Sequence, residues 1–422
     1  MTEINANEKI NRAVLVGLDA YSLSREENAT EASMEELAAL LETAGGQTMG
    51  VVMQSKDSPD ARTFIGEGKV QEVKELVQAV GADMVIFDNA LSPSQQRALS
   101  EDLKVAVMDR SALILDIFAQ RAKTKEGRLQ VELAQYKYLL PRLSGMGASL
   151  SRQGGGIGTR GPGETKLESD RRHIRERITR LQSELEQVRQ VRAVQRERRM
   201  KNSVPVVAIV GYTNAGKSTL LNQLTGAGIP ANNRLFDTLD TTSRQLHVSD
   251  NLDVVLSDTV GFIAKLPHHL VDAFRATLEE LEYADLLLHV IDSSDPNREE
   301  HIQVVDRLIT KLAKPGTKVL RCYNKADLVS PEDIPVGEDV VKMSAARGEG
   351  MEQLLQAIEA ALGHSRHHVV VTLPYSMGGM VETLHSGAQV LDIEYTGEGI
   401  VVETILDPIL YGKLKEYITK EC

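Results

Sequence analysis

One eight-residue segment constrains the fold of this chain more than any other. The apolar run 206–210 leads into the sequence GYTNAGKS at 211–218, and an apolar-periodic stretch begins at Thr219. A glycine-containing loop between a buried strand and a helix is typical of a phosphate-binding loop, whose backbone N–H groups surround nucleotide phosphates. The residues predicted to contact nucleotide here are Gly211, Tyr212, Thr213, Asn214, Ala215, Gly216, Lys217, Ser218 and Thr219.

Two downstream segments complete a predicted phosphate and magnesium site. Lys217 would neutralise the β and γ phosphates, and a Mg²⁺ held by the Ser218 hydroxyl needs a carboxylate at a strand end. Asp258 ends the apolar run 252–258, and the Gly261 amide three residues later would sense the γ phosphate. The further residues predicted to contact nucleotide here are Asp258, Thr259, Val260 and Gly261.

A threonine-rich stretch lies between these two segments and would close over the metal. We choose Thr238 as the second hydroxyl ligand, with Thr241 or Thr242 as alternatives, and a plain loop remains open as an interpretation. The predicted contacts here are Phe236, Asp237, Thr238, Leu239 and Asp240. The predicted metal ligands are thus Ser218, Thr238 and Asp258, and the predicted catalytic residues are Lys217, Thr238 and Gly261.

The base specificity follows from the strand-like run 318–324, which ends in the sequence NKAD at 324–327. The Asp327 carboxylate would accept hydrogen bonds from guanine N1–H and the 2-amino group, whereas adenine presents an acceptor at N1. Asn324 would fix the loop and Lys325 would cover the base. The predicted base contacts are Asn324, Lys325, Ala326, Asp327, Ser344, Ala345 and Ala346. Together the motifs predict a Mg²⁺-dependent GTP hydrolase.

The charge distribution points to a second kind of partner. A net charge of −12, from 48 Lys+Arg against 60 Asp+Glu, argues on average against nucleic acid. The average conceals a basic block, because residues 121–201 hold 20 Lys or Arg and 9 Asp or Glu, a net charge of +11. The other residues together carry −23. A positive patch confined to one segment predicts RNA contacts there.

The basic block has helical patterns on both sides of a glycine-rich loop, 145–163. The stretches 111–140 and 164–201 are expected to form an antiparallel hairpin, and the second has a coiled-coil seam. The seam residues are Ile174, Ile178, Leu181, Leu185 and Val188. The predicted RNA contacts are Arg152, Gly154, Gly155, Gly156, Arg160, Arg171 and Arg172. A flexible linker beside a solvated arginine-rich face stays open as the alternative.

A length of 422 residues suggests about three folded units. We expect a multidomain α/β chain: an N-terminal parallel α/β domain over 1–110, the helical hairpin over 111–203, the nucleotide-binding domain over 204–363, and a small α+β domain with a βαββα pattern over 364–422. The chain has only two cysteines, no apolar run of about 18 residues and no signal-peptide pattern. We therefore predict no membrane insertion, a cytoplasmic location and a monomer.

The glycine-rich segment also carries a family resemblance. Residues 204–363 resemble the small GTPase fold of the translation-factor-related class, and GGIGTRGPGETKLESDRR at 155–172 is similar to the signature of the HflX family of ribosome-associated GTPases. Residues 88–96, DNALSPSQQ, resemble that family's N-terminal domain. Lys166 stands where the family pattern has Gln, a surface change that puts little of the resemblance in doubt.

The resemblance implies a protein that docks on ribosomal RNA and proteins of the large subunit and places its glycine-rich tip near the peptidyl-transferase region. It also implies that the protein splits ribosomes, notably under stress, and associates with them in the cytoplasm. Two alternatives stay open. In one, the chain is a ribosome-binding module and GTP only adjusts its affinity for the ribosome. In the other, the chain is an assembly factor of the large subunit, and GTP hydrolysis only controls its release.

Two positions qualify the expected chemistry. Phe262 follows the Gly261 position where Ras-like enzymes have a water-orienting Gln, so intrinsic turnover is expected to be slow, with the ribosome supplying the missing element. The alternative is that Phe262 is a core residue and another side chain aligns the water. Asn214 resembles the Asn of cation-dependent GTPases, which helps to hold K⁺; a loop Asn bonded to its own backbone is the alternative.

Overall fold

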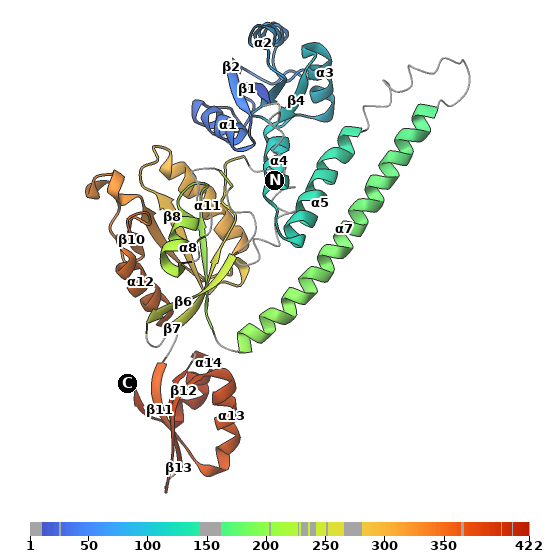
Figure 1. The fold of residues 1–422 in the computed structure, drawn as a ribbon. Coiled ribbons are helices and arrows are strands. Elements are labelled where there is room, and N and C mark those ends of the chain that lie inside the picture. The colour runs from blue at the N-terminus through green and yellow to red at the C-terminus, as the bar shows by residue number, and fades with distance from the viewer. Residues whose placement is uncertain are drawn as a thin grey trace, which may run out of the picture.

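The computed structural model describes residues 11–24, 27–143, 162–201, 204–226, 228, 235–236, 242–249, 252–265, 281–363, 367–397, 399–406 and 408–421. The described residues form three β-sheets with helices packed against them, and a long helical hairpin (Figure 1). The α/β multidomain class expected from the sequence is confirmed.

The first sheet is parallel, with strand order β2-β1-β3-β4. The elements are β1 (Arg12–Ala20), α1 (Glu31–Thr43), β2 (Gln47–Lys56), α2 (Glu67–Val80), β3 (Met84–Phe87), α3 (Pro93–Leu103), β4 (Ala106–Asp109) and α4 (Arg110–Arg121). Alternate side chains of β1 enter two hydrophobic layers, since Leu15 packs with residues of α1 and α4 and Val16 with residues of α2 and α3. Burial on both faces explains why the strand is almost entirely apolar.

The helix expected over 111–140 is two helices. α4 ends where Ala122 adopts an extended backbone, and the Thr124 hydroxyl caps a new helix, α5 (Lys125–Arg142), by accepting from the Gly127 N–H at 2.9 Å. The apolar face of α4 is buried with the first sheet and α1. An apolar helical pattern does not show which element will pack against it. The prediction therefore treated α4 and α5 as a single helix of the hairpin.

The hairpin itself consists of α5 and α7 (Pro162–Lys201), which run side by side in Figure 1. Leu129 and Leu133 of α5 pack against Leu181 and Leu185 of α7, and Ile178 lies at the edge of this seam. The Arg177 guanidinium donates to both carboxylate oxygens of Glu132 across the hairpin, at 2.8 and 2.9 Å. The predicted seam is therefore present over its central residues, where it fixes the register of the two helices.

The second sheet has strand order β10-β9-β8-β5-β7-β6, and only β6 is antiparallel to its neighbour. Its elements are β5 (Val206–Gly211), α8 (Lys217–Thr225), β6 (Thr242–Ser249), β7 (Leu252–Asp258), β8 (Leu286–Asp292), α11 (Arg298–Leu312), β9 (Lys318–Asn324), β10 (Val340–Lys342) and α12 (Met351–Gly363). Residues of α8 and α12 pack with one face of β5 and residues of α11 with the other. The carboxyl ends of β5, β7 and β9 meet at one edge, where parallel α/β sheets place their ligands.

The third sheet is antiparallel, with strand order β12-β13-β11-β14. Its elements are β11 (His367–Leu373), α13 (Gly378–Gly387), β12 (Gln389–Thr396), β13 (Gly399–Leu406), α14 (Pro408–Leu414) and β14 (Ile418–Glu421). The expected βαββα order lacked the last strand, β14, which comes after the helix α14. The helix ends at Leu414, and β14 was missed because four residues give too short an alternation to identify a strand.

Candidate nucleotide site

The phosphate-binding loop connects β5 to α8, as its sequence pattern requires. Gly216 has φ 96°, and a Cβ there would lie 2.2 Å from Asn324 Nδ2, so only glycine fits at this position. Asn214 adopts φ 61°, in the left-handed region that Asn tolerates better than most residues. The loop therefore has the tight backbone that lets successive N–H groups point at a phosphate.

Lys217 is held inside the loop by the loop's own carbonyl groups. Its Nζ donates to the carbonyl oxygens of Gly211 at 3.1 Å and of Tyr212 at 2.7 Å, and the residue is 6% exposed. Burial lowers the pKa of Lys217 to about 8, although the nearby Asp258 carboxylate acts in the opposite direction. A phosphate would replace the two carbonyl oxygens as the partner of this ammonium group.

Two of the three expected magnesium ligands, Ser218 and Asp258, lie together at the same place. The Ser218 hydroxyl, in the first turn of α8, donates to Asp258 Oδ2 at 3.0 Å, and Asp258 at the end of β7 is fully buried. A hydroxyl and a carboxylate beside a phosphate loop are the oxygen donors that Mg²⁺ prefers, so the residues fit this ion. P-loop GTPases in general use Mg²⁺, which here would be held by Ser218 and Asp258. Thr238 lies outside the described residues.

The second switch, defined here as residues 261–265, is bound to the phosphate loop through the backbone. The Phe262 N–H donates to the Gly211 carbonyl at 3.1 Å, and the Thr213 N–H donates to the Phe262 carbonyl at 2.7 Å. A Cβ at Gly261 would lie only 3.0 Å from Thr213 Cγ2 and 3.1 Å from Lys217 Nζ. The Gly261 backbone thus lies beside Lys217, at the place that the sequence predicts for the γ phosphate.

Phe262 is a core residue, and its burial is compatible with both interpretations of its sequence position. It is 2% exposed and belongs to the same hydrophobic cluster as Tyr212 and Phe236. A buried aromatic ring has no polar atom with which to align water. Any group that orients the attacking water must therefore come from elsewhere.

The base motif is assembled at the end of β9. Asn324 fixes two loops, since its Nδ2 donates to the Ala215 carbonyl at 2.8 Å and its Oδ1 accepts from the Ala345 N–H at 2.9 Å. Lys325 is anchored by Asp292, with 2.6 Å between Nζ and Oδ2. The N–H of Ala345, one of the predicted base contacts, is therefore paired with Asn324 in this structure.

Asp327 already has a cationic partner. Arg347 Nε lies 3.1 Å from Asp327 Oδ2, and the two side chains are 58% and 11% exposed. The pKa of the Asp327 carboxyl is held below its usual value, chiefly by the Ser344 hydroxyl and further by Arg347. The carboxylate is therefore charged at neutral pH, as recognition of guanine requires. Arg347 was not among the predicted residues, although its place directly after Ser344–Ala346 was a usable signal.

Several other predicted residues lie away from this cluster or outside the described residues. Phe236 is buried, with its ring 4.7 Å from that of Phe118 in α4, so only its backbone could reach a nucleotide. Arg172 is on α7, 3.8 Å from Glu176, and is exposed, whereas the neighbouring Arg171 is half-buried. The predicted residues outside the described parts are Asp237, Thr238, Leu239, Asp240, Arg152, Gly154, Gly155, Gly156 and Arg160.

The phosphate loop, the strand-end aspartate and the NKxD segment share one edge of a six-stranded sheet, and this combination defines a GTP hydrolase of the P-loop class. Comparison with protein families agrees along the chain. Residues 31–119 match the family described as GTP-binding GTPase N-terminal, 121–199 match GTP-binding GTPase Middle Region, and 206–325 match 50S ribosome-binding GTPase.

Full-length relatives identify the family. A GTPase HflX of Caldanaerobacter subterraneus is 47% identical, covering 96% of this chain and 94% of the relative, and that of Escherichia coli is 46% identical over 82% of each. The chain belongs to the HflX family of GTPases. A crystal structure of a GTP-binding protein from Sulfolobus solfataricus in complex with GDP aligns with 84% of this chain and 99% of its own, at 27% identity and a TM-score of 0.43.

Across the described ranges, none of the helices combines the length and the apolar character needed to cross a membrane. The same ranges contain no group of three or more His, Cys, Asp or Glu side chains placed to bind a metal ion. The candidate magnesium site is instead of the kind that relies on one carboxylate, one hydroxyl and the phosphates themselves.

Proposed function

We propose that this GTPase binds the large ribosomal subunit through its basic hairpin and uses GTP to separate the subunits of ribosomes, notably under stress. The observation that carries the proposal is the net charge of +11 over residues 121–201, on a hairpin joined directly to a GTPase domain. Residues 206–325 match a family described as 50S ribosome-binding GTPase, which supports the same partner. The protein would act as a monomer in the cytoplasm.

The charge is arranged so that RNA can reach it. Arg172, Arg175 and Arg180 project from α7 on its exposed side, while the leucine seam faces α5. Phosphate contacts of this kind release counterions, so binding should weaken steeply with salt. The acidic remainder of the chain is repelled by RNA, which would orient the hairpin toward the ribosome.

Hydrolysis in this proposal depends on an element that the ribosome supplies or orders. Bound Mg²⁺ would neutralise charge on the β and γ phosphates, and Ser218 and Asp258 would hold it. Lys217 would bind the same phosphates. Phe262 is buried and apolar, so the isolated chain should position the attacking water poorly and turn over slowly. We also propose that K⁺ bound near Asn214 contributes charge neutralisation.

The test is the rate of GTP hydrolysis with and without purified large subunits. The proposal predicts stimulation by large subunits that is absent with small subunits alone. The double variant Arg152→Ala/Arg160→Ala should lose the stimulation while keeping the basal rate, because both residues belong to the glycine-rich sequence 145–163 and to none of the nucleotide-binding motifs. Equal rates with and without large subunits would refute the proposal. Binding only to immature subunits would favour an assembly factor.

A further inference from the structure

A buried ion pair ties the end of helix α5 to the N-terminal sheet. Asp109 is the last residue of β4, and Tyr138 and Arg142 lie in the last two turns of α5. The Arg142 guanidinium donates to Asp109 Oδ2 at 3.2 Å, and the Tyr138 hydroxyl donates to Asp109 Oδ1 at 3.0 Å. The Asp109 side chain is 1% exposed and that of Arg142 is 16% exposed. One carboxylate at a strand end thus binds two side chains of the hairpin.

Arg142 also binds the loop before α3 and α3 itself. Its Nε donates to Gln96 Oε1 at 2.9 Å, and its Nη2 donates to the Leu91 carbonyl oxygen at 2.9 Å. The guanidinium lies over the Tyr138 ring, 3.4 Å from the ring centroid. Leu91 and Gln96 belong to the sequence DNALSPSQQ at 88–96, which has no role in the proposed function. Because a guanidinium is planar and its N–H groups point in fixed directions, these contacts define the orientation of α5 as well as its position.

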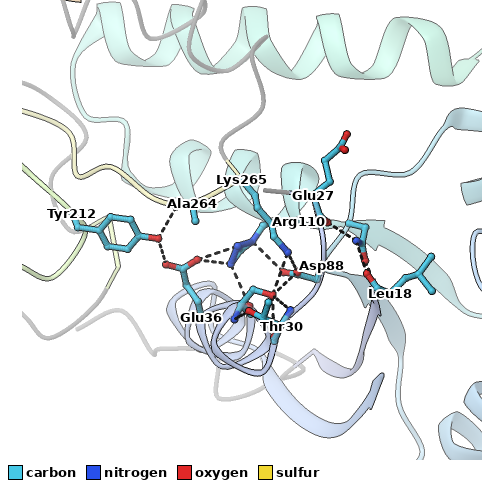
Figure 2. A network of polar contacts seen from close by, with 11 residues as sticks. Leu18, Glu27, Thr30, Glu36, Asp88, Arg110, Tyr212, Ala264 and Lys265 are labelled. Atoms are coloured by element: carbon cyan, nitrogen blue, oxygen red, sulfur yellow. Dashed lines mark hydrogen bonds and ion pairs between the residues drawn. The ribbon is translucent and has the colours of Figure 1, made fainter. Parts of the chain in front are cut away.

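Asp109 is itself held firmly in the N-terminal sheet. Its carboxylate accepts from two backbone N–H groups, at 3.0 and 3.2 Å. The next residue, Arg110, belongs to a separate network of polar contacts, which Figure 2 shows. Arg110 binds Glu36 of α1 at 2.6 Å and lies 3.4 Å from Asp88 Oδ1, and Asp88 also pairs with Lys265 of the second switch. The start of α4 is therefore fixed, and Asp109 provides a fixed point for α5.

The ion pair closes a corner that α4 and α5 form. Only residues 122–124 separate the two helices, so α5 could turn about this corner. Val131 and Ala134 of α5 pack in the hydrophobic cluster that includes α4, but apolar packing has no preferred direction. Asp109 lies directly before α4 and Arg142 at the end of α5. With 18 residues α5 is about 27 Å long, so a turn of about 10° at the corner would move its end by about 5 Å.

Helix α7 follows any movement of α5, because α5 lies between α4 and α7 (Figure 1). The leucine seam and the pair of Arg177 with Glu132 bind α7 to α5. The direction of α5 therefore orients the exposed arginines of α7, which are Arg172, Arg175 and Arg180. Replacement of buried ion pairs by apolar groups often costs no stability, so we attribute to the pair at the end of α5 a role in geometry.

We propose that Gln96, Asp109, Tyr138 and Arg142 form a hairpin junction that sets the angle between the helical hairpin and the N-terminal sheet, and that this angle determines how well the hairpin fits the large ribosomal subunit. The second part rests on the proposed function. Tyr138 and Arg142 are positioning residues, because they act on RNA only through the helices whose direction they fix. A hairpin with a fixed direction binds more tightly because it loses less freedom on binding. The junction acts in every nucleotide state.

The angle is measured first in the free protein, as the distance between two spin labels by electron paramagnetic resonance. The labels are attached at Gln78→Cys on α2 and Gln187→Cys on α7, both exposed positions. The chain also contains Cys422→Ser, and Cys322 is buried. Arg142→Met should broaden the distribution of distances by about 5 Å. A distribution that Arg142→Met leaves unchanged would overturn the proposal.

The matched control is Arg62→Met. Arg62 forms a bidentate pair with Asp102 in the same domain, with both N–O distances at 2.9 Å, and neither residue belongs to the hairpin. The control therefore removes the same charge and the same kind of pair. It should leave the label distances as they are in the wild-type chain. Equal broadening in Arg62→Met and Arg142→Met would count against the junction.

The second measurement is the rate of GTP hydrolysis as a function of the concentration of large subunits. Arg142→Met should raise the concentration that gives half of the maximal stimulation by roughly fivefold to tenfold, and should leave the basal and maximal rates unchanged. A lower maximal rate alone, or no difference from Arg62→Met, would overturn the link between the angle and the ribosome. If large subunits do not stimulate the wild-type chain, the proposed function fails, whereas the label distances still decide whether the junction sets the angle.

Tyr138→Phe tests the junction without a change in charge. Burial, and next the Asp109 carboxylate, raise the pKa of Tyr138, so its hydroxyl keeps the proton that it donates to Asp109. Tyr138→Phe removes this hydrogen bond and keeps the ring below Arg142. Both measurements should change in the same direction as for Arg142→Met, but less. If Arg142→Met does not fold, Tyr138→Phe replaces it, and label distances equal to those of the wild-type chain would then refute the proposal.

Discussion

Replacing Asp327 by Asn should change the nucleotide that this protein binds. The carboxylate is charged, 11% exposed and placed at the end of β9, where it would accept two hydrogen bonds from guanine. An Asn amide offers one acceptor and one donor, so one guanine N–H faces another N–H. One charged hydrogen bond is lost and the other becomes a weaker neutral one, which together cost roughly 3 to 5 kcal/mol, or about 200-fold to 5,000-fold in Kd.

Xanthine carries a carbonyl oxygen where guanine has its 2-amino group, and the Asn amide can donate to that oxygen. Asp327→Asn should therefore bind XDP more tightly than GDP, reversing the wild-type order. Isothermal titration with GDP and XDP measures both affinities directly. A loss of GDP affinity of less than about threefold would refute the assignment of Asp327 to the base, because it would lie far below the cost of one charged hydrogen bond.

The neighbouring charges provide matched controls. Glu349 lies 3.9 Å from Arg347 and is 61% exposed, so Glu349→Gln should leave GDP affinity unchanged. Arg347 pairs with Asp327 but is 58% exposed, and such pairs contribute about 0 to 1 kcal/mol. Removal of this competing cation by Arg347→Gln should tighten GDP binding by at most about fivefold. A large loss of GDP affinity in Arg347→Gln would mean that Arg347 contacts the nucleotide.

Three further predictions concern the phosphate loop and the hairpin. Burial lowers the pKa of Lys217 to about 8 in the free protein, and binding of the phosphates requires the charged form of this side chain, so GDP affinity should be constant below that pH and fall roughly tenfold by about pH 9. A Lys217→Arg variant should bind GDP more weakly but without this dependence on pH. A GDP affinity of the wild-type protein that does not change with pH would contradict the prediction. Leu181→Ala removes a fully buried side chain from the seam and should lower the stability of the hairpin by about 2 to 5 kcal/mol, which would appear as faster hydrogen exchange in α5 and α7. Val191 is 58% exposed, so the control variant Val191→Ala should leave the exchange rates unchanged. GTP hydrolysis should be faster in potassium than in sodium buffer if K⁺ binds near Asn214. Equal rates in the two buffers would refute the proposed role of K⁺.

Motifs whose residues are close in the sequence predicted most of the nucleotide site. The phosphate loop and the NKxD segment each lie within eight residues, and their strand-loop context is visible as apolar runs on either side. The structure brings Ser218 to Asp258 because Asp258 ends β7, the phosphate loop follows β5, and the two parallel strands pair directly. Local sequence patterns together with a parallel sheet were therefore sufficient to predict that Ser218 and Asp258 lie together.

Contacts between distant segments were beyond the sequence. Lys265 and Asp88 are 177 positions apart, and nothing in either segment indicates that the second switch reaches the N-terminal sheet. The break between α4 and α5 was missed because both helices are amphipathic, although they pack against different partners. The burial of Phe262 was not visible either, because its place directly after Gly261 does not show which residues pack around it. In each case tertiary packing, and not local propensity, decides.

The most direct test of the account is sucrose-gradient sedimentation of intact ribosomes with this protein. The account predicts that the protein with GTP or a non-hydrolysable analogue converts ribosomes into separate subunits and migrates with the large one, whereas GDP leaves the ribosomes intact. Splitting of ribosomes by the GDP-bound or nucleotide-free protein would show that the protein is a ribosome-binding module whose affinity GTP only adjusts. An unchanged ratio of ribosomes to subunits in every nucleotide state would contradict the proposed function.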